Sequence, residues 1–208
     1  TVACREGHTL WLAMDTEIRK YHAHSLALLE TFSHPCFHNI HSVAVHFDEL
    51  YVTSTGLDMV VVLDKLTGAI KNRINAEGKP VWHRFSENID YRMMHSTRPH
   101  DCHPNYVFWL DGNPWVTRCT QEDAVMLNDP NHRIDISGPG KTISVHDGVV
   151  MDGKVHFTTV DGCIVVADFK RNQSTETIDL SEFKGFGGLR GWCRGLFFLD
   201  DLCYVGFS

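Results

Sequence analysis

The sequence predicts an all-β fold, a β-propeller of four-stranded antiparallel blades. The segment HSVAVHFDELYVTS, which starts at His41, returns without a gap from His146 as HDGVVMDGKVHFTT. Each copy continues through short segments rich in Val, Ile, Thr, Phe and Tyr, separated by Gly, Asp or Asn. Such segments are typical of strands joined by tight turns. A repeat of about 40–50 residues with four strands per copy is typical of a β-propeller.

The strands of each copy can be read in order. The copy at His41 contains HSVAVHF, ELYVTSTG, DMVVVLDKLTG and AIKNRINAEG, and the copy at His146 contains HDGVVMDG, KVHFTTVDG, CIVVADFKRNQ and STETIDLSEF. A third copy around Asn105 reads NYVFWLDG, NPWVTRC, EDAVMLNDP and NHRIDISG. TVACREG, HTLWLAMD, EIRKYHAHS and LALLETFS form an earlier copy, and GWCRGLFFLDD with LCYVGFS forms half of a fifth. We therefore expect about five blades that start near residues 1, 41, 103, 146 and 193, the last one incomplete.

One spacing between copies is longer than the others. Aligning one residue of each copy gives spacings of 40, 64, 41 and 47 residues. The aligned residues are Leu10, Leu50, Pro114, Val155 and Leu202. The long spacing contains KPVWHRFSENIDYRMMHSTRPHD, where apolar residues show no sustained helical period, so we expect an inter-blade insertion loop over 79–102. We expect residues 1–208 to form a single propeller domain around it.

Composition and charge exclude several classes of protein. The net charge of −7 argues against a nucleic-acid partner, which needs a basic face. No apolar run approaches the roughly 18 residues of a membrane span, and TVACREG lacks the charged and apolar regions of a signal peptide. The seven cysteines show no CxxC spacing, which favours free thiols over a disulfide framework. We therefore expect a soluble, cytoplasmic protein.

Three phrases of the sequence carry a resemblance to a family. LWLAMDTEIRKY, NIHSVAVHFDELYVTSTG and CRGLFFLDDLCYVGFS resemble, in the same order, the LWLAT-x-x-x-I-W-R-F, D-I-H-D-x-A and R-G-L-x-F…VG-x-S phrases of a group of bacterial β-propellers of unknown function. Ser42 stands where that family has Asp, and Lys20-Tyr21 replaces its Trp-Arg-Phe. More loosely, STGLDMVVVLDKLTG looks like the strand phrases of NHL-type and quinoprotein-like propellers. The resemblance implies the propeller fold and brings no activity with it.

The repeat places polar residues at the start of each innermost strand. The same offset from the aligned residues gives Thr1, His41, Asn105, His146 and Cys193. His103 lies two places before Asn105 and reaches the same place if a bulge intervenes, and Arg194 follows Cys193. We expect these side chains to gather at the mouth of the central channel, roofed by the insertion loop.

Two kinds of ligand fit this expected cluster. Imidazole and thiolate are preferred ligands of borderline metals, so His41, His103, His146 and Cys193 are candidate ligands of a divalent transition metal such as Zn, Fe or Cu. In a second, metal-free arrangement, a small molecule binds Asn105 and pairs its carboxylate or phosphate with Arg194 or Arg190. A third alternative is purely structural, with each histidine bonding the backbone of the next blade. The sequence identifies no catalytic residue.

Two functions remain open at this point. The first is a small-molecule-binding or enzymatic propeller, in the enzymatic case a metal-dependent lyase, hydrolase or oxidoreductase. The second is a protein–protein interaction scaffold without catalysis, which needs no polar cluster on the channel axis. The incomplete last blade leaves a strand edge at Leu202 to Ser208, and we expect a C-terminal continuation or an additional chain to cover it and close the ring.

Overall fold

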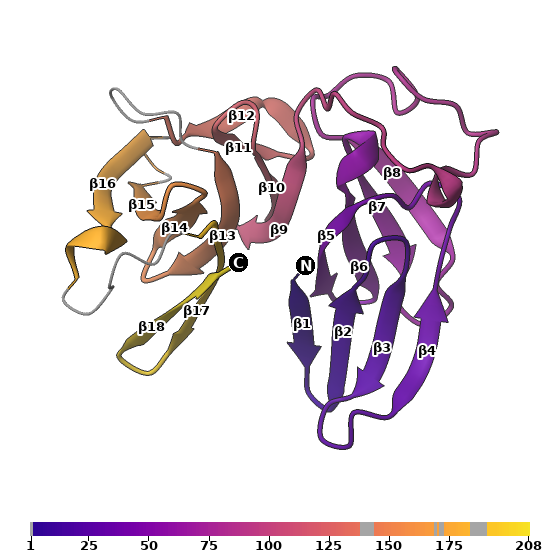
Figure 1. Cartoon of the computed structure of the whole chain (residues 1–208), viewed down its shortest axis with the longest axis horizontal. Helices are drawn as coiled ribbons and strands as arrows, with labels where there is room; N and C mark the ends of the chain where they lie inside the picture. The colour runs from indigo at the N-terminus through magenta and orange to yellow at the C-terminus, as the bar shows by residue number, and fades with distance from the viewer. Residues whose placement is uncertain (1, 138–143, 169, 171–172, 184–190) are drawn as a thin grey trace. The chain divides into compact units, whose positions relative to one another are not determined.

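The computed structural model describes residues 2–137, 144–168, 170, 173–183 and 191–208 (Figure 1). Within these residues the regular structure is β-strand, apart from three single-turn 3₁₀ helices, so the predicted all-β class is confirmed. The 3₁₀ helices are η1 (Thr55–Leu57), η2 (Tyr91–Met93) and η3 (Leu180–Glu182). The chain divides into two compact units, unit 1 (Thr1–Val107) and unit 2 (Phe108–Ser208), and each is described by itself. The single domain over residues 1–208 stays a prediction.

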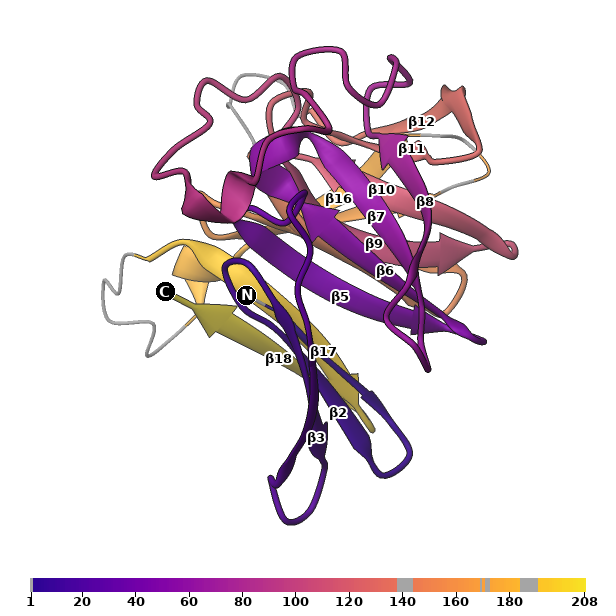
Figure 2. The same ribbon diagram turned by 90° about the vertical axis from the view of Figure 1, so that its right-hand side faces the viewer.

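Unit 1 contains two complete four-stranded antiparallel sheets of the propeller-blade type, in which each strand pairs with the next along the chain (Figures 1 and 2). Blade 1 consists of β1 (Ala3–Glu6), β2 (Thr9–Ala13), β3 (Ile18–His22) and β4 (Leu28–Phe32). Blade 2 consists of β5 (Ile40–His46), β6 (Glu49–Ser54), β7 (Met59–Asp64) and β8 (Ile70–Asn75).

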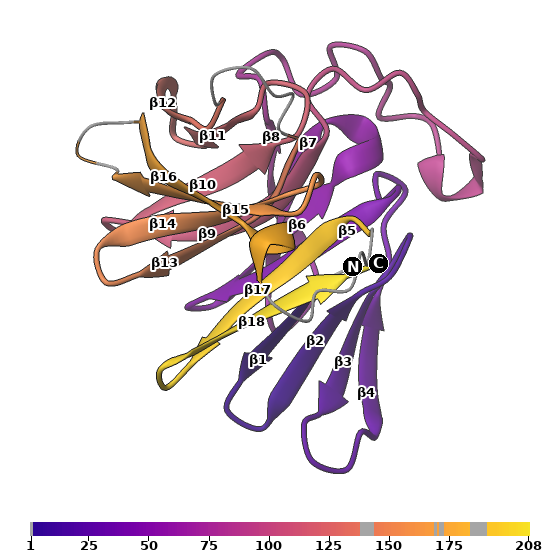
Figure 3. The same ribbon diagram turned by 60° about the vertical axis from the view of Figure 1, so that its left-hand side comes forward.

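Unit 2 holds two more blades and a hairpin. Blade 3 consists of β9 (Pro104–Leu110), which begins in unit 1, β10 (Asn113–Arg118), β11 (Asp123–Met126) and β12 (Asp129–Asp135). Blade 4 consists of β13 (Val145–Met151), β14 (Lys154–Thr159), β15 (Cys163–Asp168) and β16 (Gln173–Asp179). The hairpin, β17 (Cys193–Leu199) and β18 (Leu202–Phe207), lies beside β13 and β14 (Figure 3).

The strand order confirms four complete blades and a half blade. The first strands begin at residues 3, 40, 104, 145 and 193, close to the predicted starts. The strand pairs within these blades are antiparallel. One parallel pair, Asp135 with Gln173, joins the last strands of blades 3 and 4. This parallel pair was not expected, and it links two blades rather than changing either one.

The hairpin turn between the first two strands of a blade needs a left-handed backbone. Asp111, Asp152 and Asp200 take φ values of 49–51° at this turn. Asp tolerates this region because its short polar side chain can bond locally. Gly153 follows with a φ of 71°, as expected for an Asp-Gly pair in a tight hairpin turn. Blade 2 has Phe47 at this place, with a φ of 51° and an exposed ring.

The core of unit 1 lies between its two blades. Leu50 and Val52 of β6 are fully buried, as expected for alternate residues that face one side of a sheet. They belong to one apolar cluster with Trp11 of blade 1 and with alternate residues of β7 such as Val61. Burying side chains of this size contributes about 1.5–3 kcal/mol each. The third strand of the blade, β7, is therefore as much a part of the core as the second.

The long insertion between β8 and β9 has no regular structure beyond the single turn η2, as the sequence predicts (the trace at the top of Figure 2). Its buried anchor is Tyr91, whose backbone N–H donates to the carbonyl of Pro35 at 2.8 Å. No helix within the described ranges has the length and apolar character needed to cross a membrane. The seven cysteines are all free thiols.

Candidate functional site

A β-bulge recurs near the start of the first strand in blade 2, blade 4 and the hairpin. The register shifts lie between Ile40 and Val43, between Val145 and Gly148, and between Cys193 and Leu196. At each shift two residues of the first strand face one residue of the second strand, so their side chains no longer alternate simply between the two faces. The bulge pairs are His41-Ser42, His146-Asp147 and Arg194-Gly195.

The register corrects the alignment of the last repeat. Cys193 pairs with Phe207 just before the bulge, as Ile40 pairs with Ser54 in blade 2. Arg194, and not Cys193, therefore occupies the position equivalent to His41. The prediction was one residue out because Leu202 was aligned with Leu50, whereas the pairing places Cys203 at that position.

Threonines opposite the bulges connect neighbouring blades. The hydroxyl Oγ1 of Thr53 accepts the backbone N–H of Ser42 at 2.8 Å, and Thr158 accepts that of Asp147 at 3.0 Å. In blades 2 and 4 the bulge thus leaves a backbone donor that a threonine satisfies, whereas Gly206 lies opposite the bulge of the hairpin. Thr53 also lies 3.3 Å from the Asn105 carbonyl, toward which its hydroxyl donates. In blade 3, Thr117 makes the corresponding bond to the carbonyl of His146 at 2.6 Å.

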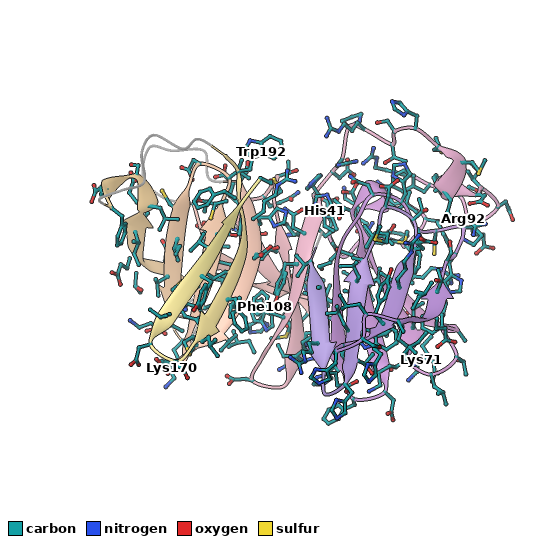
Figure 4. All side chains as sticks on the ribbon, turned by 60° about the horizontal axis from the view of Figure 1, so that its bottom comes forward. His41, Lys71, Arg92, Phe108, Lys170 and Trp192 are labelled. Carbon is teal, nitrogen blue, oxygen red and sulfur yellow. The ribbon has the colours of Figure 1, made fainter. Side chains whose placement is uncertain are left out.

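In unit 1 the structure brings three of the predicted residues together at the start of β5 and β9 (His41 is labelled in Figure 4). The Nδ1 atom of His41 is 2.6 Å from Oδ1 of Asn105, so Nδ1 carries the proton and donates it. The ring of His103 meets that of His41 edge-on, with centroids 4.9 Å apart. The left-handed backbone of His103, with a φ of 54°, turns the chain into β9 at this point.

His100 extends this cluster into the insertion. Its Nδ1 lies 2.6 Å from Nδ1 of His103, and its Nε2 lies 3.5 Å from Oγ1 of Thr97. The Thr97 hydroxyl donates to the carbonyl of Gly56, so it accepts from His100. His100 then accepts from His103 through Nδ1, which requires a neutral His100 ring. Burial lowers the pKa of His100, opposed by the charge of Asp58, and this agrees with that protonation state.

Asp58 holds the end of the insertion against blade 2. Its carboxylate is buried and accepts the backbone N–H groups of three successive residues, Asp101, Cys102 and His103, at 2.9–3.0 Å. Arg84 completes the arrangement with an ion pair of 2.8 Å to Oδ2. The carboxylate therefore fixes the backbone that carries His100 and His103. Because Asp58 is separated by more than 40 residues from these donors, no local sequence pattern pointed to it.

A polar pocket of about 330 Å³ lies beside this cluster. It is formed by the turn between β2 and β3, the segment before β5 and the insertion, and its lining contains three imidazoles, one guanidinium and one carboxylate. The lining residues are Asp15, His38, Asn39, His95, Ser96, Thr97, Arg98 and His100. Within it, Nε2 of His38 donates to the carbonyl of Met94 at 3.0 Å, which fixes that ring. Gly56 packs so closely on His38 that a Cβ there would lie 2.0 Å from Nδ1.

One arginine of the insertion remains available to a ligand. Arg84 and Arg92 pair with Asp58 and Asp90, whereas the ion pairs found in the described parts of the chain do not include Arg98. The Arg98 side chain is exposed at the pocket. The sequence predicted that the insertion roofs the mouth of the channel, but it did not point to Arg98 and Thr97. The run HSTRPH, dense in polar side chains and closed by a proline, was the available signal.

Unit 2 places the other predicted residues around the bulge of β13. His146 and Asp147 are both buried, and Nδ1 of His146 lies 2.5 Å from Oδ1 of Asp147. The guanidinium of Arg194 stacks on the indole of Trp192 at 4.3 Å (Trp192 is labelled in Figure 4). Burial lowers the pKa of Arg194, and the nearby Cys119 and Asp147 act in the opposite direction.

Cys193 is buried like a residue of the core, and this makes its thiol unreactive. It is fully buried, and burial together with the charge of Asp147 raises its pKa to about 12. Metal ligation and nucleophilic attack both use the thiolate, which such a pKa disfavours at neutral pH. Arg190, the remaining predicted residue, lies outside the described residues.

The predicted metal ligands are not arranged around one point within either unit. Across the described ranges, no group of three or more His, Cys, Asp or Glu side chains could hold a metal ion. In unit 1 the Nδ1 atoms of His41, His100 and His103 are engaged in hydrogen bonds with protein groups. The transition metal expected from the sequence therefore stays a prediction.

Comparison with known proteins supports the fold alone. No protein-family model matches the chain, and no curated protein matches it. Among solved structures, the crystal structure of the computationally designed Ika8 protein matches with a TM-score of 0.56 at 14% sequence identity. The match covers 99% of this chain and 54% of the designed chain, so this chain spans about half of that protein's length.

Proposed function

We propose that the protein is a β-propeller that binds a small anionic molecule, a carboxylate or a phosphate, in the pocket between the insertion and blade 2. The observation that carries this proposal is Arg98, an exposed guanidinium outside the described ion pairs, at a pocket of about 330 Å³ lined by three histidines. Guanidinium groups bind carboxylates and phosphates through paired, charge-assisted hydrogen bonds. Thr97 and Ser96 add hydroxyls of the kind that orient such ligands.

The histidines give the pocket a second capacity. His100 is held neutral, with Nδ1 accepting from His103 and Nε2 donating to Thr97, so it would take a proton from a bound molecule only once the bond from His103 is broken. The chain His103–His100–Thr97 would then adjust its protons without moving the backbone, because Asp58 fixes that backbone. An acid–base reaction on the bound anion is the enzymatic form of the proposal. Binding without turnover is the simpler form.

Ligand binding can be measured directly with known probes. Inorganic phosphate, sulfate, citrate and acetate are titrated against the protein by calorimetry, with glucose as an uncharged comparison. Losing a charge-assisted hydrogen bond costs about 1.5–3 kcal/mol, so Arg98→Gln should weaken binding of the best anion at least tenfold. Arg5→Gln removes an exposed guanidinium on β1, outside the pocket, and should leave the affinity unchanged.

The lone carboxylate of the pocket gives a test of opposite sign. Asp15 faces the same space as Arg98 and repels an anion, so Asp15→Asn should strengthen anion binding. If no probe binds, or if Arg98→Gln and Arg5→Gln behave alike, the pocket is not an anion site and a scaffold role becomes the better proposal. Elemental analysis of the purified protein separately tests the transition metal predicted from His41, His103, His146 and Cys193.

A further inference from the structure

Asp15 and Arg98 bring opposite charges to the same pocket without pairing with each other. Asp15 lies in the turn between β2 and β3, and Arg98 lies in the insertion. Both residues are exposed, and the ion pairs found among the described residues include neither side chain. The pocket therefore offers a carboxylate and a guanidinium to one ligand at the same time.

The backbone that carries each of these charges is anchored to blade 2. The carbonyl of Asp15 accepts the N–H of Ile40 at 3.0 Å, which ties the turn to the start of β5. Thr97, immediately before Arg98, is buried and donates its hydroxyl to the carbonyl of Gly56. Because both positions are already held by the fold, a ligand that bridges them orders little backbone when it binds.

The two charges favour a ligand that carries both signs. A simple anion is attracted by Arg98 and repelled by Asp15, and a simple cation meets the reverse. A molecule with a carboxylate and an ammonium gains from both, because a guanidinium binds a carboxylate through paired hydrogen bonds and a carboxylate accepts from an ammonium. Such a molecule is the class of ligand whose charges match those of the pocket.

The size and the lining of the pocket limit this ligand further. Its volume of about 330 Å³ is near the lower end of the range of about 300–1,000 Å³ that is usual for small-molecule pockets. Each of the lining side chains is polar, so the pocket has no surface for a large apolar group. The ligand is therefore expected to be small and polar.

We propose that this pocket binds a small zwitterion, an amino acid with a short or polar side chain, with its carboxylate at Arg98 and its ammonium at Asp15. The inference rests on the anion site proposed above and names the class of its ligand. Ser96 supports the orientation, because its Oγ accepts the backbone N–H of Arg98 at 3.3 Å and its own hydroxyl proton remains for the carboxylate.

Matched pairs of probes test the inference by calorimetry at neutral pH. Glycine is compared with acetate, β-alanine with propionate, and 4-aminobutyrate with butyrate. Each pair differs by one ammonium group, and the series lengthens the distance between the two charges. The best amino acid should bind about tenfold more tightly than its partner, the ratio expected for one added hydrogen bond between charged groups. Ethylamine, which carries the ammonium alone, should bind more weakly than that amino acid.

One substitution should act on the two kinds of probe in opposite directions. Asp15→Asn should weaken binding of the best amino acid about tenfold, while the matching carboxylate, which Asp15 repels, should bind more tightly. Loss of folding would weaken both probes, so it cannot produce this result. Asp48→Asn changes an exposed carboxylate of blade 2 outside the pocket and should leave both affinities unchanged.

The outcomes separate this inference from the proposed anion site. If carboxylates bind and Arg98→Gln weakens them, but amino acids bind no more tightly than their partners, the anion site stands and the zwitterion inference is overturned. It is also overturned if the advantage of the amino acid survives in Asp15→Asn, because the ammonium is then held elsewhere. If neither carboxylates nor amino acids bind, both the inference and the proposed function fail.

Discussion

Replacing Asp58 by Asn removes the charge that holds the end of the insertion while keeping the shape of the side chain. Asn also tolerates the left-handed backbone of this position, where φ is 54°, so the turn itself is not disturbed. In the native protein Oδ1 accepts the N–H groups of Cys102 and His103, and Oδ2 accepts those of Asp101 and Arg84. Asn has one carbonyl oxygen, so one of these two pairs of donors must face an NH₂ group.

The magnitude follows from the bonds that are lost. Hydrogen bonds to a charged group contribute about 1.5–3 kcal/mol each, and two are lost. The Arg84 side chain is 25% exposed and regains part of its share from water. We therefore expect local opening of residues 98–103 to become about 3 kcal/mol easier, which corresponds to about a hundredfold faster amide exchange.

Hydrogen–deuterium exchange of a peptide that covers residues 98–103 measures this change. Asp90→Asn is the matched control, because Asp90 is a carboxylate of the same insertion in an exposed pair with Arg92. An exposed pair contributes at most about 1 kcal/mol, so the control should change exchange less than about fivefold. If Asp58→Asn exchanges within threefold of the native protein, Asp58 does not hold the insertion and our account of the site's rigidity is wrong.

Three further changes test the bulge, the hairpin turn and the imidazole pair. Thr53→Val removes the acceptor of the buried Ser42 N–H and should lower the free energy of unfolding by about 1–3 kcal/mol. Urea denaturation measures this change, and an unchanged midpoint would contradict the role of Thr53 at the bulge. Phe47→Asn should raise the free energy of unfolding by about 1 kcal/mol, because the left-handed φ of 51° costs an ordinary side chain about 1–2 kcal/mol. A lower melting temperature of this variant would refute the prediction. Burial lowers the pKa of His100 below its usual 6.5 in the folded protein, so below pH 6.5 the unfolded chain binds more protons than the folded one. The free energy of unfolding that the neutral ring contributes above pH 6.5 is therefore lost as the pH falls through the pKa of the folded protein. Between about pH 7.5 and 5 the melting temperature should fall less for His100→Gln than for the native protein. The exchange rate of the His103 backbone amide should likewise change less with pH in the variant.

The blade pattern could be predicted because its signals are local. Alternation of apolar residues, Asp-Gly turns and the spacing of copies all lie within a few tens of residues, and they placed each first strand within two residues of its start. The last copy was shifted by one residue because GLFFLDDLCYV is apolar on both faces, so alternation does not fix its register. That slip put Cys193 where Arg194 belongs.

The candidate site could be predicted only in part. The repeat predicted that His41 lies near Asn105 and His103, and His41 does contact both of them. The binding of Asp58 to backbone groups far along the chain has no sequence signature, because its donors are N–H groups that every residue except proline carries. The pocket also depends on where the irregular insertion folds back, and turn preferences do not determine that path.

The threonine hydrogen bonds between neighbouring blades have a consequence for how the number of blades can increase by duplication. Thr53 satisfies the bulge of its own blade and reaches the first strand of the next, and Thr117 reaches forward in the same way. A duplicated unit therefore carries its own connector, and the connector binds a backbone carbonyl, which any residue supplies. Copies can be gained while the residue at the bulge changes, as it does between His41 of blade 2 and Arg194 of the hairpin. The threonine hydrogen bond between blades is inherited with each copy, and the side chain at the bulge remains free to change under selection.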